Sequence, residues 1–158
     1  MAFEFTPAIV AGLLAGIVME MPLFLAKAAG IRVKQNIFRT WGKMLGLGEG
    51  AARYVAGFAF HEALSAAVAL VYAVAFDRLG VGGNVWLWGL VGGFVHWTLA
   101  GPVVKVLPSV DPDTGEVGRQ GLAYRHYGAL DVVMSLGGHL TFGLAFALLY
   151  AALHPGGR

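Results

Sequence analysis

The sequence contains no cysteine, which excludes disulfide bonds, thiolate metal ligands and covalently attached haem. Charged residues are scarce and make up 13% of the chain. A phosphate-binding loop, a dinucleotide fingerprint and a serine–histidine–acid arrangement are also missing, so we find no catalytic residue and no basis for predicting an enzyme. What is present is a chain with 58% hydrophobic residues, the composition of a membrane protein.

Four apolar runs are each long enough to cross the hydrocarbon core of a bilayer, which takes about 20 helical residues. They do not show the alternation of apolar and polar residues that barrel strands need, so we predict helices. The predicted fold class is all-α integral membrane, with a single membrane domain over residues 1–158 and four transmembrane helices in a bundle. The predicted helices span residues 7–26, 54–76, 85–104 and 129–153.

Lysine and arginine are distributed unevenly between the predicted loops. Nine of the eleven basic residues lie in or beside loops 27–53 and 105–128, and only Arg78 and Arg158 lie on the other side. Because basic residues accumulate on the cytoplasmic side, we predict that both loops are cytoplasmic and both termini outside, in a bacterial-type inner membrane. The net charge of +2 reflects this topology, so we expect the lipid bilayer and no nucleic acid as a partner. The first run lacks the basic region and cleavage site of a signal peptide, and we expect it to be retained.

The two predicted cytoplasmic loops differ in character. Over residues 31–46, apolar residues recur at helical spacing while the basic residues fall largely elsewhere. This pattern predicts an interfacial helix in the headgroup region, or a helix that docks on a partner. In the second loop, Asp111, Asp113 and Glu116 stand among turn residues, but their spacing fails the twelve-residue calcium-loop pattern, so we predict a solvated turn.

Two pairs of segments indicate an internal repeat. The segment "GLLAGIV", which begins at Gly12, aligns with "GLVGGFV", which begins at Gly89. The segment "HEALSAAVALVYA", which begins at His61, aligns with "HLTFGLAFALLYA", which begins at His139. Two predicted helices separate each residue from its counterpart, so we predict a tandem repeat of two parallel helical hairpins about an axis along the membrane normal.

The first segment of each repeat contains a GxxxG pair, which lets helix backbones approach closely in lipid. We therefore expect the helices at 7–26 and 85–104 to cross near the centre of the molecule or at a dimer seam. The glycines concerned are Gly12, Gly16, Gly89 and Gly93.

Ionisable side chains occur within all four predicted helices, although a charge at the centre of a spanning helix costs roughly 2.5–3.5 kcal/mol. The direction of each helix places all of them between the membrane centre and the cytoplasmic face. Several such groups together carry a high free-energy cost unless they pair, bind an ion or border water. The groups are Glu20, His61, Glu62, His96, Asp131 and His139.

The first functional hypothesis is a binding site for haem b or a transition metal. Histidine is the commonest metal ligand, and helical bundles build metal sites from glutamates and histidines on facing helices. His61 and His139, related by the repeat, are the expected ligands. Glu20 and Glu62 are expected to be ligands or charge partners, and His96 is the next candidate.

The second hypothesis is a proton- or cation-coupled small transporter that acts as a dimer, because four helices are few to enclose a pathway. Its relay groups would be Glu20, Glu62 and Asp131. Glu20 resembles the glutamate in the first of the four helices of the small multidrug transporters, and that resemblance is limited to one residue.

The third hypothesis is a structural or accessory subunit of a larger membrane complex. Its partners would be other membrane subunits, bound through the glycine faces and the interfacial helix. It predicts that Glu20, His61 and His139 can be replaced without loss of activity of the assembly.

The glycine-rich first helix and the segment "GGHLTFGLAFALLYA" in the last resemble a family of small four-helix bacterial inner-membrane proteins of unknown function. The resemblance covers most of the chain. It implies the four-helix architecture and says nothing about chemistry.

Overall fold

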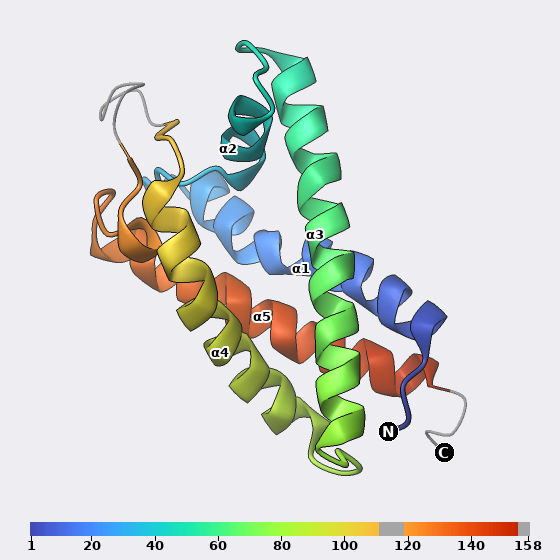
Figure 1. Ribbon diagram of the computed structural model, residues 1–158. Coiled ribbons are helices and arrows are strands. Elements are labelled where there is room, and N and C mark those ends of the chain that lie inside the picture. Colours follow the sequence, from blue (N-terminus) through green and yellow to red (C-terminus); the bar gives the residue numbers. More distant parts are fainter. Residues whose placement is uncertain (111–118, 155–158) are drawn as a thin grey trace. The chain divides into compact units, whose positions relative to one another are not determined.

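The computed structural model describes residues 1–110 and 119–154, which are predominantly helical. Four of the helices are long and apolar enough to cross a membrane, so the predicted all-α membrane fold class is confirmed (Figure 1). The acidic turn at Asp111, Asp113 and Glu116 lies outside the described residues. The helices are α1 (Phe5–Ala28), α2 (Ile37–Met44), α3 (Ala51–Arg78), α4 (Val85–Val106) and α5 (Ala129–Leu153), with a short 3₁₀ helix at Leu122–Tyr124.

Three of the four long helices extend beyond the predicted apolar runs. α1 and α3 gain residues at both ends and α4 gains two at its C-terminus, whereas α5 has the predicted bounds. Helical hydrogen bonding does not have to stop where the hydrocarbon ends. Basic residues stand in the added terminal turns, where they interact favourably with the C-terminal helix dipole: Lys27, Arg78 and Lys105.

The helix predicted over residues 31–46 is shorter than expected and covers only Ile37–Met44. It begins there because Asn36 caps its N-terminus. The backbone of Asn36 is extended, and its side chain accepts a hydrogen bond from the backbone N–H of Arg39 at 3.0 Å. It ends before Gly46, which has a φ of +79°.

The chain forms two compact units. The first comprises Met1–Met21, Glu62–His96 and Gly138–Arg158. Its core combines small residues on α1 with aromatic rings on α3 and α5, and such a combination lets helices approach while the rings fill the remaining space. The buried small residues include Ala8, Ala11 and Ala15, and the buried rings include Tyr72, Phe76, Phe142, Phe146 and Tyr150.

In the first unit the GxxxG pair of α1 packs against α3. A Cβ added to Gly12 would lie 3.1 Å from the carbonyl oxygen of Ser65 and would also meet Ala69. A Cβ added to Gly16 would lie 2.7 Å from Ser65 Oγ. The partner residue number falls as the glycine number rises, so the two helices run antiparallel.

The GxxxG pair of α4 packs in the same way against α5. A Cβ added to Gly89 would lie 2.7 Å from the Cβ of Ala147, and one added to Gly93 would lie 2.5 Å from the carbonyl oxygen of His139. Each pair therefore joins its helix to the next long helix in the chain. Within the chain, the close neighbours of these glycines lie on α3 and α5, so the glycines do not join the helices at 7–26 and 85–104 to each other. A crossing of these helices at a dimer seam stays a prediction.

The second unit comprises Pro22–His61 and Trp97–Gly137. Here α2 lies against the N-terminal part of α3 (Figure 1), and a Cβ added to Gly42 would lie 2.6 Å from Cγ of Arg53. The ring of Phe38 contacts Tyr54 and Phe58 of α3 edge-on, with centroids 5.2 and 5.3 Å apart. Phe38 of α2 thus packs on α3, whereas Met44 at the C-terminal end of α2 is exposed.

Candidate functional site: a buried carboxyl group in the first unit

Glu62 lies in α3, and its side chain points towards α1. A Cβ added to Gly16 would lie 2.9 Å from Oε2 of Glu62 and 2.7 Å from Oγ of Ser65, so both oxygens border one small space beside α1. Glu62 and Ser65 share a helix face because they are three residues apart. Both residues are buried, with exposed fractions of 9% and 5%.

The carboxyl group of Glu62 has no compensating polar contact. Both of its oxygens are shielded from solvent, and neither has a hydrogen-bond partner within residues 1–110 and 119–154. Buried polar groups are nearly always hydrogen-bonded, and a buried charge is normally paired. Glu62 is therefore an exception that calls for an explanation.

A cluster of rings lies elsewhere in the first unit. His96 of α4 and His139 of α5 contact each other edge-on, with ring centroids 4.7 Å apart. Tyr72 of α3 lies 6.1 Å from His96, and Phe142 lies 5.6 Å from His96. The hydroxyl group of Tyr72 is buried and has no hydrogen-bond partner in the part of the chain that the structure describes.

The structure brings together only some of the predicted ligands. The first unit contains Glu20, Glu62, His96 and His139, whereas His61 belongs to the second unit, where its ring lies 5.4 Å from that of Phe38. Of the described residues, no three His, Asp or Glu side chains form a group that could hold a metal ion. The pairing of His61 with His139 stays a prediction, and among the described residues the ring of His139 contacts that of His96.

Asp131 has a clear structural partner in the second unit. Its Oδ1 accepts hydrogen bonds from the backbone N–H groups of Lys34 and Gln35, at 3.0 and 2.8 Å. The side-chain amide of Gln35 in turn donates to the carbonyl oxygen of Asp131 at 2.9 Å. These bonds hold the extended segment before α2 on the first turn of α5, which is why the segment is not helical.

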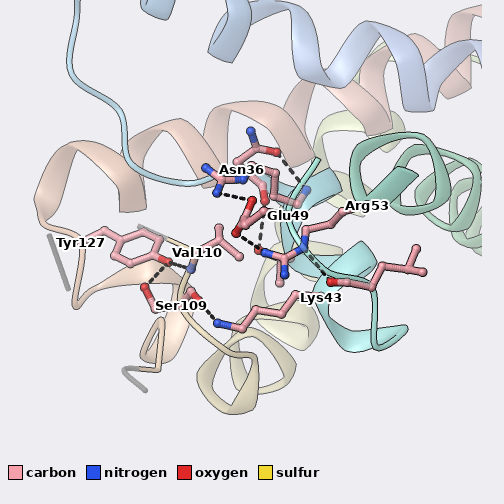
Figure 2. A network of polar contacts seen from close by, with 10 residues as sticks. Asn36, Lys43, Glu49, Arg53, Ser109, Val110 and Tyr127 are labelled. Atoms are coloured by element: carbon pink, nitrogen blue, oxygen red, sulfur yellow. Dashed lines mark hydrogen bonds and ion pairs between the residues drawn. The ribbon is translucent and has the colours of Figure 1, made fainter. Parts of the chain in front are cut away.

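A polar network surrounds α2 in the second unit (Figure 2). Glu49 accepts from Arg39 at 2.8 Å and forms a second ion pair with Arg53. Lys43 donates to the carbonyl oxygen of Ser109 at 3.0 Å, and the hydroxyl groups of Ser109 and Tyr127 are 2.9 Å apart. These contacts join the two loops that are rich in basic residues and give Lys43, Glu49 and Arg53 a structural role.

Sequence reasoning did not assign a role to Ser65 or Tyr72. The helical spacing of Ser65 from Glu62 is a signal that could have identified it. Tyr72 aligns with Tyr150 in the predicted repeat, yet only the structure shows that their hydroxyl groups differ in hydrogen bonding. Tyr150 Oη accepts from the N–H of Glu4 at 2.9 Å and donates to the carbonyl oxygen of Ala2, whereas the hydroxyl group of Tyr72 has no partner among the described residues.

Searches among protein families, curated proteins and solved structures find no match to this chain. The resemblance to small four-helix bacterial inner-membrane proteins therefore stays a prediction.

Proposed function

We propose that the protein is a proton- or cation-coupled small membrane transporter in which Glu62 is the coupling group. The observation that carries this proposal is the burial of both carboxyl oxygens of Glu62 without a hydrogen-bond partner among the described residues. Glu62 lies within a helix long and apolar enough to span a membrane. Ionisable residues in such helices are characteristic of proton relays and ion pathways.

A carboxylate in an apolar interior is strongly unfavourable unless a cation or hydrogen-bond donors compensate it. Glu62 can therefore be accommodated in two ways, as the neutral acid or with a bound cation. If the carboxyl group alternates between these two forms, binding of a cation accompanies release of the proton, and binding of the proton accompanies release of the cation. This property is the elementary requirement for coupled transport.

The same geometry ranks the three relay candidates. The carboxylate of Asp131 accepts hydrogen bonds from the backbone N–H groups of Lys34 and Gln35. Protonating it or moving it would therefore also free the extended segment before α2. Glu20 is buried as well, but it takes part in a polar or electrostatic interaction. Glu62 carries neither constraint, so we assign the coupling role to Glu62 among the three predicted relay groups.

The proposal includes the topology and the architecture. Both termini would be outside and both basic loops cytoplasmic, as the distribution of lysine and arginine favours. The tandem repeat is supported by the equivalent antiparallel contacts that Gly12 and Gly89 make. A second copy of the chain would complete the pathway, because four helices enclose little space.

Binding of haem b or a transition metal is the second candidate function. The contact between His96 and His139, with centroids 4.7 Å apart, is the observation that favours it. Its test is an absorption spectrum and elemental analysis of protein purified in mild detergent. A Soret band or near-stoichiometric iron, copper or zinc, lost in His139→Ala, would support this candidate over transport.

Transport is tested in liposomes that contain the purified protein and a trapped pH-sensitive dye. With a pH gradient imposed and the membrane potential clamped, Na⁺, K⁺ and tetraphenylphosphonium are added in turn. We expect at least one of these cations to drive proton flux, and we expect Glu62→Gln to abolish that flux. Asp77→Asn is the control, since Asp77 is an exposed carboxylate on the same helix. A cation-driven flux that is the same in Glu62→Gln and in the wild type would contradict the proposal.

A further inference from the structure

The core of the first unit contains a tyrosine hydroxyl group without a hydrogen bond. Tyr72 of α3 is 7% exposed, and its hydroxyl group has no partner within residues 1–110 and 119–154. Buried tyrosine hydroxyl groups usually have a partner, as that of Tyr150 does in Glu4 and Ala2. The described part of the chain thus leaves an oxygen in this core that a ligand can bind.

One edge of the Tyr72 ring lies against α4, and that edge includes the carbon that carries the hydroxyl group. A Cβ added to Gly92 would lie 2.7 Å from Cε1 and 3.2 Å from Cζ of Tyr72. His96 is four residues after Gly92 and therefore lies on the same face of α4. The centroids of the Tyr72 and His96 rings are 6.1 Å apart. Tyr72 and His96 thus face each other between α3 and α4.

His96 also contacts His139 of α5, with ring centroids 4.7 Å apart and ring planes at 76°. A metal–nitrogen bond of about 2.0–2.1 Å puts an imidazole centroid about 3 Å from the ion, so two imidazoles in neighbouring coordination positions have centroids about 4.5–5 Å apart. The measured separation agrees with this value. Axial ligands on opposite sides of one haem would have centroids about 6 Å apart, so the contact leaves no room for a porphyrin between the rings.

We propose that Tyr72, His96 and His139 bind one transition-metal ion through two imidazole nitrogens and a phenolate oxygen. This proposal rests on the second candidate function and does not depend on Glu62. The neutral imidazoles bind without losing a proton, whereas the phenol of Tyr72 releases its proton as the metal–oxygen bond forms. One proton is released for each ion bound, and no electron is transferred.

The three side chains determine the class of metal. Imidazole suits zinc, copper, iron and nickel, whereas calcium and magnesium require about six or more oxygen ligands. Among divalent ions of the first transition row, affinity for such a site is highest for copper. The phenolate neutralises one of the two charges of the ion, which lowers the cost of placing the ion among apolar helices. We therefore expect Cu²⁺ to bind more tightly than Zn²⁺, and Ca²⁺ and Mg²⁺ not to bind.

The test is titration of the purified, chelator-treated protein with Cu²⁺ in mild detergent, followed by visible absorption and electron paramagnetic resonance. We expect one ion per chain, a charge-transfer band from phenolate to copper, and release of one proton to a dye in weak buffer. His96→Ala and His139→Ala should each weaken binding by more than about tenfold, since even the loss of an outer-shell partner costs 10–100-fold.

Tyr72→Phe isolates the contribution of the phenolate. This variant should bind Cu²⁺ more weakly, without the charge-transfer band and without proton release. Tyr150→Phe is the matched control, because Tyr150 is the buried tyrosine at the corresponding position of the predicted repeat, and it should keep both signals. Circular dichroism of each variant establishes that it is folded.

Three results would overturn the proposal. Binding that is unchanged in folded His96→Ala and His139→Ala variants would place the ion elsewhere. A charge-transfer band and proton release that persist in Tyr72→Phe would remove Tyr72 from the site and leave metal binding as a function. A Soret band that is lost in His139→Ala would show haem instead of a single ion. If the wild type binds no Cu²⁺, Zn²⁺ or haem, the second candidate function fails as well.

Discussion

Replacing Gly143 by alanine tests how the second helix pair is held together. A Cβ on Gly143 would meet the carbonyl oxygen of Gly89, and it would lie 2.8 Å from the backbone nitrogen and 3.0 Å from Cα of Gly93. All three atoms belong to the backbone of α4, so no side-chain rotation can relieve the overlap. The helices must move apart and lose contacts along their length.

The expected magnitude follows from two opposing effects. Overpacking a close contact typically costs about 1–3 kcal/mol. Replacing a glycine inside a helix by alanine returns roughly 0.5–1 kcal/mol through backbone entropy. Because the added Cβ meets only backbone atoms, the overpacking cost should lie near its upper end, and Gly143→Ala should lower the free energy of unfolding by about 2 kcal/mol. Gly137→Ala, on the same helix, has nothing within 4 Å of the added Cβ and should be neutral or slightly stabilising.

The assay is unfolding in mixed detergent micelles with increasing sodium dodecyl sulfate, followed by circular dichroism. Both variants are made in the same background and compared with the wild type. Equal unfolding curves for Gly143→Ala and Gly137→Ala would refute the close contact between the α4 and α5 backbones.

Two further pairs of variants distinguish polar groups that stabilise the fold through hydrogen bonds from those that do not. Asp131→Ala should expose the N–H groups of Lys34 and Gln35 and lower the free energy of unfolding by about 1–3 kcal/mol, with faster hydrogen exchange at both residues, whereas Asp131→Asn should have little effect. Tyr150→Phe should lower the free energy of unfolding by about 1 kcal/mol and make the N-terminus more sensitive to protease, because the hydroxyl group bonds Glu4 and Ala2. Tyr72→Phe should not lower it, since that hydroxyl group has no hydrogen-bond partner in the described residues. Similar losses in both tyrosine variants would contradict this distinction.

The long helices could be predicted from the sequence because a run of about 20 apolar residues leaves the backbone few alternatives in lipid. The bounds of α5 agree with the prediction, and α1 differs by two residues at each end. Ends are harder to predict, because the terminal turns leave the hydrocarbon and depend on caps and polar contacts. The short α2 is the clearest case, since the bonds of Asp131 to Lys34 and Gln35 keep the preceding segment extended.

The residue types of the candidate site could be predicted, but their partners could not. Glu62 stood out because it is ionisable and lies within an apolar run. Helical periodicity, however, does not say which neighbouring helix a face meets. The glycines were recognised as contact positions, and only the structure shows that Gly16 faces Ser65 and Glu62. The contact between His96 and His139 likewise joins residues of two helices whose relative rotation the sequence leaves open.

The central claim is that Glu62 has a chemical role and that packing does not require it. The most direct measurement is the unfolding of Glu62→Leu in the same detergent assay. The account predicts a variant at least as stable as the wild type, because a buried polar group without a partner is replaced by the residue that the second helix pair carries at Leu140. A variant that unfolds more readily than the wild type would show that the carboxyl group of Glu62 holds the structure together, and would contradict the account.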